Sequence, residues 1–283
     1  MKDYLNFDGA VCVVTGASSG IGKATAEILV DLGAIVHTLD VQNCTIPGIH
    51  QHIGTNLADK SSIDQAFEKL PGKIDKFFGI AGVFGFGHDI PTAFTINFIA
   101  NKYMTEEYII PRLTEGEYGA IAYLSSVGGS RWAYHLDEYK DLVEAKTWDD
   151  MVAAIKVKPV GGKPGSDAYE LSKRALNYYL KTRAPEIASK GNRMNALAPH
   201  YTETPMLEGI IAASEADGSP MDFSSKGAFE RLGKPADAAK AIIFLNSDMA
   251  VYISGHILYE EGGMQAMIET GRMPVYMDEP TWN

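Results

Sequence analysis

The sequence has few cysteines and no excess of positive charge. Two of its 283 residues are cysteine, Cys12 and Cys44, and neither lies near a second cysteine or a histidine at the spacing of a metal site. We therefore expect free thiols, no metal centre and a reducing, cytoplasmic location. The net charge of −11 argues against nucleic acid or an anionic membrane as a partner, because both attract positively charged surfaces.

Long apolar runs are also missing. No stretch approaches the about 18 consecutive apolar residues of a membrane-spanning helix, and the first residues do not form the apolar core of a signal peptide. With 46% hydrophobic and 22% charged residues, the composition is that of a soluble protein with a substantial core. No internal repeat divides the chain, and we expect a single domain over residues 1–283.

Short apolar runs alternate with segments of helical periodicity along most of the chain. This alternation predicts an α/β fold of the Rossmann type: a doubly wound, seven-stranded parallel sheet with helices on both faces. Strands are expected at residues 10–15, 35–40, 49–53, 74–81, 120–125, 193–198 and 256–260. Helices are expected near residues 21–32, 61–70, 92–110, 166–188 and 235–246.

Residues 130–165 interrupt the alternation with a charged segment that carries several aromatic residues. The spacing of its apolar residues predicts one helix over residues 137–154. We interpret the segment as a helical insertion. It could be a solvated surface helix, or it could shape subunit contacts or the entrance to the site.

A glycine-rich turn joins the first predicted strand to the first predicted helix. It reads Thr-Gly-Ala-Ser-Ser-Gly-Ile-Gly from Thr15 to Gly22, and Gly33 marks the end of the helix. The glycines let the backbone approach a pyrophosphate, and the helix N-terminus supplies unpaired N–H groups. Strand, turn and helix together indicate a dinucleotide site.

Asp40 ends the second predicted strand and is the residue expected to select the dinucleotide. A carboxylate there accepts hydrogen bonds from both ribose hydroxyls and repels a 2′-phosphate, and no basic residue stands nearby to pair with that phosphate. We therefore expect NAD(H) rather than NADP(H); the alternative is an aspartate that only begins a turn. The expected contacts in this half are Gly16, Ser18, Ser19, Gly20, Ile21, Gly22, Asp40, Val41 and, at the adenine edge, Asn56 and Leu57.

Tyr169 and Lys173 stand one turn apart on the same face of a predicted helix. Alcohol oxidation or carbonyl reduction needs a proton acceptor or donor beside the hydride path, and a tyrosine can serve if its pKa falls from about 10 towards neutrality. A nearby ammonium and the positive charge of nicotinamide could supply that lowering. Behind a dinucleotide-binding half, the pair indicates an acid/base site.

Two further polar residues are candidates for the same site. Ser126 follows a predicted strand at its carboxyl end, where open parallel sheets bind ligands, so its hydroxyl can hold the substrate's oxygen beside the tyrosine. Asn97 lies inside a predicted helix, where asparagine is unfavourable unless its amide has a partner.

These motifs resemble those of the short-chain dehydrogenase/reductase family, in its single-domain branch, over roughly residues 8–264. The loop has that branch's Thr-Gly-x-x-x-Gly-x-Gly form. Ile80-Ala81-Gly82 resembles the family's Asn-Ala-Gly turn, with Ile80 in place of asparagine. The resemblance implies a catalytic tetrad of Asn97, Ser126, Tyr169 and Lys173.

The resemblance also implies a role for each member of the tetrad. Tyr169 would be the acid/base, and Lys173 would bind the nicotinamide ribose and lower the pKa of the tyrosine. Ser126, preferred to Ser125 because the family's Ser-x-x-Gly spacing then matches, would orient the substrate oxygen. Asn97 would hold a water molecule in the proton relay through its backbone neighbourhood.

The segment from Asn195 to Met206 is similar to the family segment that anchors the nicotinamide carboxamide, by the backbone of Thr202 and the hydroxyl of Thr204. His200 stands where the family usually has glycine. Coenzyme contacts implied by the resemblance are Ala81, Gly82, Tyr169, Lys173, Pro199, Thr202 and Thr204.

The insertion, the Thr-Glu-Thr-Pro-Met-Leu run and the short tail resemble bacterial 3α-hydroxysteroid dehydrogenase/carbonyl reductases. A hydroxysteroid or bile acid is thus the expected substrate, with contacts from Ser126, Tyr169, His200 and Met206. Residues 205–230 would form a mobile lid whose apolar surface comes from Met206, Leu207, Ile210, Ile211, Met221 and Phe223.

Other functions stay open. A reductase of non-steroid carbonyls, such as quinones or diketones, would use the same site, and a catalytically silent NAD-sensing protein would keep the fold alone. The lid residues could simply pack on the sheet. The apolar tail, residues 264–283, is expected to pack on its own subunit or across the interface of a homodimer or homotetramer.

Overall fold

The computed structural model describes residues 4–85, 87–158, 160, 164–216, 218 and 226–273. Within these ranges seven strands form one parallel sheet in the order β3-β2-β1-β4-β5-β6-β7, which confirms the predicted doubly wound fold. The strands are β1 (Val11–Thr15), β2 (Ile35–Asp40), β3 (Gln51–Gly54), β4 (Lys76–Gly79), β5 (Ala120–Leu124), β6 (Arg193–Pro199) and β7 (Ile257–Glu260).

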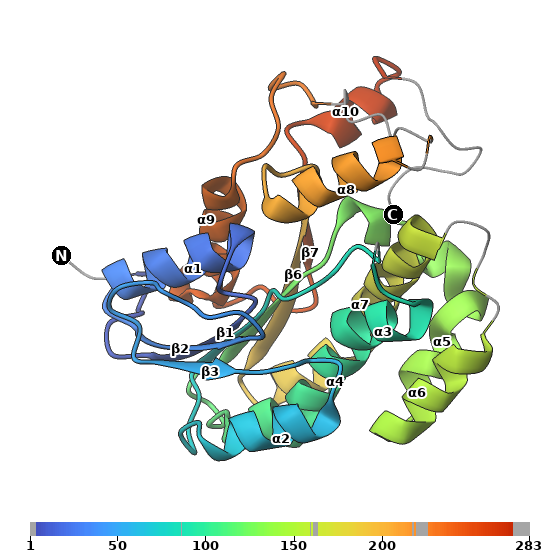
Figure 1. Ribbon diagram of the computed structural model, residues 1–283. Helices are drawn as coiled ribbons and strands as arrows, with labels where there is room; N and C mark the ends of the chain where they lie inside the picture. The colour runs from blue at the N-terminus through green and yellow to red at the C-terminus, as the bar shows by residue number, and fades with distance from the viewer. Residues whose placement is uncertain are drawn as a thin grey trace.

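Helices cover both faces of the sheet, as predicted (Figure 1). Successive side chains of a strand point to opposite faces, so Val13 and Val14 enter different hydrophobic cores. One face is covered by α1 (Gly20–Asp31) and α9 (Pro235–Asn246). The other is covered by α2 (Lys60–Glu68), α3 (Ile90–Phe94), α4 (Ala100–Met104) and α7 (Pro164–Ser189).

The helix predicted at residues 92–110 is not regular. Two π-helical turns, Thr95–Ile99 and Thr105–Ile109, alternate with α3 and α4, and a 3₁₀ turn at Ile110–Arg112 ends the segment. The first π turn contains Asn97. Short π-helical turns are frequent at functional sites, and no periodicity in the sequence indicates them.

The insertion contains two helices, α5 (Leu136–Glu144) and α6 (Trp148–Val157), so the prediction of one continuous helix over residues 137–154 is wrong. Both pack into the hydrophobic core on the α7 side of the sheet (Figure 1). Short 3₁₀ turns at Val127–Gly129 and Trp132–His135 lead into them, and another lies at Asp248–Ala250.

Two local interactions explain the break between α5 and α6. The ammonium of Lys102, on α4, donates hydrogen bonds to the carbonyl oxygens of Val143 and Ala145 at 2.7 and 2.6 Å, where α5 ends. The hydroxyl of Thr147 accepts from the N–H of Asp150 at 3.1 Å and caps α6.

Two helices lie beyond the carboxyl end of the sheet (Figure 1). α8 (Pro205–Ala216) begins the predicted lid, and α10 (Met264–Glu269) begins the predicted tail. Met221 and Phe223 of the predicted lid and residues 274–283 of the tail lie outside the described residues. Among the helices that the structure describes, none is long and apolar enough to cross a membrane.

Close backbone contacts fix Gly16 and Gly22. A Cβ atom on Gly22 would lie 2.0 Å from the carbonyl oxygen of Gly16, and one on Gly16, whose φ is +73°, would lie 2.7 Å from Cα of Ala81. The hydroxyl of Thr15 accepts hydrogen bonds from the N–H groups of Ile80 and Ala81 at 2.9 and 3.0 Å. The turn after β1 is therefore bound directly to the segment after β4.

Gly22→Ala should lower the free energy of unfolding by about 1–3 kcal/mol, because the new methyl group overpacks the turn. Urea unfolding measures the change. Gly72→Ala is the matched control, since a Cβ on Gly72 would meet nothing within 4 Å. Equal effects of the two substitutions would contradict the steric account.

Candidate active site

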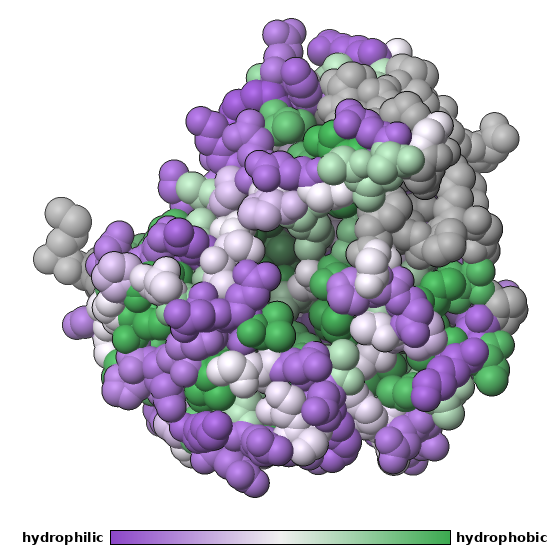
Figure 2. Space-filling model, viewed as in Figure 1, coloured by the Kyte–Doolittle hydropathy of each residue, from purple (hydrophilic) through white to green (hydrophobic). Residues whose placement is uncertain are grey.

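A cavity of about 540 Å³ lies beyond the carboxyl ends of β1, β4, β5 and β6, next to the point where the strand order reverses. Figure 2 shows it as a hollow near the centre of the view, with hydrophobic residues inside. Every residue predicted to contact coenzyme or substrate that the structure describes lines this cavity, except Ile211 of the predicted lid. Of the predicted tetrad, Asn97 alone does not.

One end of the cavity is formed by the turn before α1. Ser19, the residue before the helix, makes no side-chain cap, so the first N–H groups of α1 have no side-chain acceptor. Together with the bare backbone of Gly16 and Gly22, this arrangement fits a phosphate group. Farther along, Leu57 is buried, and Asn56 uses its Oδ1 to accept from the N–H of Ala58 at 3.0 Å.

Asp40 places a carboxylate beside this turn. Its Oδ2 accepts from the N–H and the hydroxyl of Ser18 at 3.0 and 2.5 Å, and its Oδ1 accepts from the N–H of Gln42 at 2.9 Å. The bond to Gln42 is the turn contact of the alternative interpretation, so the residue begins a turn and also faces the cavity. The exposed Val41 lies beside it on the cavity wall.

Tyr169 and Lys173 face the cavity from α7, as their spacing predicted. The Lys173 ammonium lies 5.4 Å from the centre of the Tyr169 ring and donates a hydrogen bond to the carbonyl oxygen of Leu124 at 2.7 Å. Burial lowers the pKa of Lys173 to about 8. Burial raises the pKa of Tyr169, and a hydrogen bond with Ser126 acts against that rise. The lowering expected from Lys173 together with the charge of nicotinamide stays a prediction.

The two serines after β5 have different environments. The hydroxyl of Ser125 donates to Oδ1 of Asn177 at 2.7 Å inside the protein. Ser126 accepts from the N–H of Gly128 at 3.1 Å and interacts with Tyr169. The geometry therefore agrees with the choice of Ser126 as the serine beside the phenol.

Asn97 lies behind the cavity wall and is fully buried. Its amide oxygen accepts from the N–H of Val83, and its amide nitrogen donates to the carbonyl oxygen of Val83, each at 2.8 Å. The nitrogen also donates to the hydroxyl of Ser172 at 3.1 Å. The side chain thus fixes the segment after β4 against α7. The backbone carbonyl oxygen of Asn97 accepts from Nδ2 of Asn101 at 3.0 Å.

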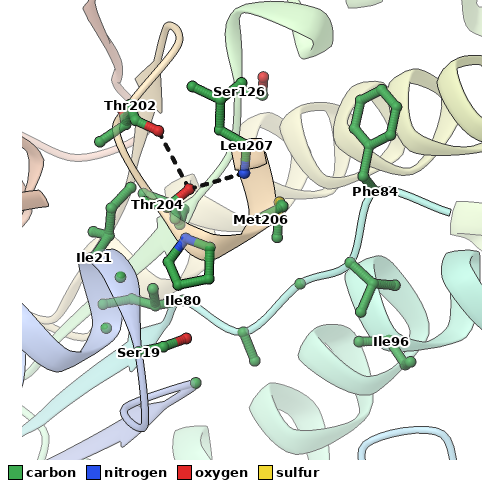
Figure 3. Close-up of a pocket in the computed structure, with 18 of the residues that line it drawn as sticks. Ser19, Ile21, Ile80, Phe84, Ile96, Ser126, Thr202, Thr204, Met206 and Leu207 are labelled. Atoms are coloured by element: carbon green, nitrogen blue, oxygen red, sulfur yellow. Dashed lines mark hydrogen bonds between the residues drawn. The ribbon is translucent and has the colours of Figure 1, made fainter. Parts of the chain in front are cut away.

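The segment after β6 closes the cavity from the other side. The hydroxyl of Thr204 donates to the carbonyl oxygen of Thr202 at 3.2 Å and accepts from the N–H of Leu207 at 3.3 Å (Figure 3). The hydroxyl of Thr202 donates to the carbonyl oxygen of His200 at 3.0 Å. Both threonines therefore line the cavity while holding the start of α8.

Several lining residues were missed by sequence reasoning, notably Phe84, His88 and Ile96. Phe84 lies in a stretch with glycines on its carboxyl side, where no periodicity indicates burial. Ile96 precedes Asn97 inside the π turn. Its apolar character was the only available signal.

Two family models match this chain: short chain dehydrogenase over residues 10–140, and Enoyl-(Acyl carrier protein) reductase over residues 150–265. A coniferyl-alcohol dehydrogenase of a Pseudomonas species is 30% identical over 89% of this chain and 95% of its own length. The chain therefore belongs to the short-chain dehydrogenase/reductase family, as the sequence motifs indicated. It is an oxidoreductase that acts on alcohol or ketone groups, and its fold carries a nucleotide coenzyme.

Other relatives differ in substrate. A 3-oxoacyl-(acyl-carrier-protein) reductase of Thermotoga maritima is 27% identical, with 92% of this chain and 99% of that protein covered. A 3-alpha-hydroxysteroid dehydrogenase/carbonyl reductase of Comamonas testosteroni is 25% identical, with 92% and 98% covered.

Solved structures share the fold. A 3-alpha-hydroxysteroid dehydrogenase of a Pseudomonas species, complexed with NADH, superposes with a TM-score of 0.76 at 22% identity, over 92% of this chain and 99% of that one. A short chain dehydrogenase of Burkholderia cenocepacia, in complex with NADP, gives 0.69 at 22% identity, over 93% and 99%. The fold therefore accommodates either coenzyme.

His200 should make the protein sensitive to acid. Both ring nitrogens are buried without a hydrogen-bond partner, and burial lowers the pKa of His200 to about 4. Between the usual pKa near 6.5 and this value the unfolded chain binds a proton that the folded chain does not, so stability falls as the pH falls through that window. The melting temperature should drop less between pH 7 and pH 4.5 in His200→Gln than in the wild type. Identical drops would show that another group is responsible.

Proposed function

We propose that this protein is an NAD(H)-dependent oxidoreductase that transfers a hydride between nicotinamide and a secondary alcohol or ketone, with a hydroxysteroid or bile acid as its substrate. The observation that carries the proposal is the convergence of Ser126, Tyr169 and Lys173 with the glycine turn on one cavity. A nucleotide-sensing protein without turnover needs only the turn. An acid/base group beside the coenzyme site favours an enzyme.

The residues present fit a dinucleotide. The uncapped start of α1 and the close glycine backbones suit a pyrophosphate. The carboxylate of Asp40 lines the cavity where it would accept hydrogen bonds from the hydroxyls of a ribose. At the other end, Lys173 and the segment Pro199 to Thr204 would hold the nicotinamide riboside. When bound, the coenzyme supplies the hydride acceptor or donor.

The chain's own residues would handle the proton. During oxidation the alcohol carbon would give up a hydride to the coenzyme, its O–H proton would pass to the oxygen of Tyr169 in its ionised, phenolate form, and the C–O single bond would become a carbonyl. Ser126 would hold the same substrate oxygen. Burial raises the pKa of the phenol. The positive charge of oxidised nicotinamide would therefore act together with Lys173 to lower that pKa towards neutrality.

The substrate proposal rests on the apolar part of the cavity. Met206, Leu207 and Ile210 of α8 line it and would offer surface to a flat hydrophobic molecule. A quinone or diketone reductase is the alternative, and a panel of 3-, 7-, 12- and 17-oxo steroids and simple ketones, followed by NADH fluorescence, separates the two. Four expectations from the sequence stay predictions: a mobile lid, a cytoplasmic location, a homodimer or homotetramer, and the lack of nucleic-acid or membrane partners.

Tyr169→Phe should reduce turnover by about 10²–10⁴-fold, the usual effect of losing an acid/base, while NADH binding changes little. Steady-state rates and a fluorescence titration of NADH measure the two quantities. A variant with near-normal rates would remove Tyr169 from the mechanism.

Asp40→Asn should weaken the preference for NAD(H) over NADP(H) by about tenfold or more, because it removes the negative charge that repels a 2′-phosphate and keeps the size of the side chain. The ratio of kcat/KM for the two coenzymes is the measurement. An unchanged ratio would mean that Asp40 only organises the turn through Ser18 and Gln42.

A further inference from the structure

We infer that Phe84 selects the substrate, as an aromatic platform for a ring that contains or carries the reacting carbon. The inference rests on the proposed oxidoreductase function. It narrows the substrate class to ring-bearing alcohols and ketones without a charged group beside the reacting carbon, whatever the ring system.

Phe84 is held close to the acid/base residue. Its ring centre lies 5.0 Å from that of Tyr169, with the ring planes inclined by 39°. The preceding residue, Val83, is fixed through both backbone groups by Asn97. In the view of Figure 3, Phe84 and Ser126 lie apart from each other, with Met206 below them. The platform therefore has a defined position relative to the phenol.

That position matches the reach of a substrate. The substrate oxygen must come within about 2.6–3.2 Å of the Tyr169 oxygen for proton transfer. Because the ring of Phe84 contacts that of Tyr169, at 5.0 Å between the ring centres, a ring that contains or carries the reacting carbon lies within reach of Phe84. A ring at this place would contact Phe84 at the separations that aromatic pairs adopt, about 4.5–7 Å between centres.

The surrounding wall suits a substrate whose ring has no charged group beside the reacting carbon. Among the described residues that line the cavity, Asp40 and Lys173 are the only ones with a carboxylate, ammonium or guanidinium group. Asp40 is hydrogen-bonded to Ser18 at the far, glycine-turn end, and Lys173 to the carbonyl oxygen of Leu124. A carboxylate or phosphate beside Phe84 would leave water with only Lys173 to compensate its charge, and that ammonium is already hydrogen-bonded to Leu124, so its burial is unfavourable.

A rigid ring should also gain more binding free energy from contact with Phe84 than an open chain does. A flat surface fixed by packing is covered by a ring without loss of internal rotations. An alkyl or acyl chain must give up several rotations to lie flat on the same surface. The site should therefore favour ring-bearing alcohols over linear ones of equal carbon number.

The test uses three eight-carbon secondary alcohols: 1-phenylethanol, 1-cyclohexylethanol and 2-octanol. The wild type, with NAD, should oxidise the two ring alcohols with higher kcat/KM than 2-octanol. Phe84→Leu should reduce the ratio of 1-phenylethanol to 2-octanol by about two- to tenfold, the range expected for one aromatic pair. Taking the ratio between wild type and variant cancels the intrinsic reactivity of each alcohol.

Matched variants distinguish the loss of the aromatic contact at Phe84 from nonspecific effects of a substitution on the fold. Phe84→Tyr keeps the ring and should keep the ratio, and Phe84→Met should repeat the loss seen with leucine. Phe244→Leu makes the same change at a half-buried position of α9 that does not line the cavity, and should also keep the ratio. An NADH titration of each variant reports whether the coenzyme end is intact.

The outcomes are distinct. An unchanged ratio in Phe84→Leu, or a wild type that prefers 2-octanol, overturns the role of Phe84 while alcohol oxidation stands. Oxidation of mandelate as fast as 1-phenylethanol overturns the restriction to substrates without a charged group beside the reacting carbon. If a protein that binds NADH oxidises none of the three alcohols, the proposed function fails, and this inference fails with it.

Discussion

The buried side-chain amide of Asn97 connects the segment after β4 to α7, the helix that carries Tyr169 and Lys173. Asn97 bonds both backbone groups of Val83 and the hydroxyl of Ser172, which in turn donates to the carbonyl oxygen of Tyr169 at 2.6 Å. The segment after β4 is also bound to the glycine turn through the hydroxyl of Thr15. Any shift of one part would leave buried polar groups unpaired, at about 1–3 kcal/mol each. The distance between the coenzyme end and the phenol is therefore fixed by hydrogen bonds from outside the cavity.

The electrostatics of the phenol follow from where the lysine is held. Lys173 is almost fully buried and already donates to the Leu124 carbonyl, so its ammonium lies beside the Tyr169 ring rather than on its oxygen. Burial disfavours the charged form of both groups, so the pKa of Lys173 falls to about 8 while the pKa of Tyr169 rises, and the two values move apart. The positive charge of oxidised nicotinamide, present only when the coenzyme is bound, would lower the pKa of the phenol. Proton transfer would then depend on whether the coenzyme occupies the site.

The sequence was informative wherever one local rule decides the structure. The sheet could be predicted because strands buried on both faces read as continuous apolar runs, and the glycine turn because only glycine permits its backbone contacts. The break after Glu144 could not, since Lys102 causes it from a distant helix; only the Thr147–Asp150 cap offered a local signal. For the site, the spacing of Tyr169 and Lys173 was sufficient to place both. Phe84 was missed because its position depends on an asparagine of another segment.

The missing cap at Ser19 has a consequence for the protein as a whole. A helix start whose N–H groups find no side-chain acceptor is a local weakness that an anionic ligand can repair. A ligand that binds only the native form adds about 2.7 kcal/mol at a hundredfold excess over its Kd. The cellular supply of dinucleotide would then govern how long the polypeptide survives proteolysis, so that abundance of the enzyme would follow abundance of its coenzyme.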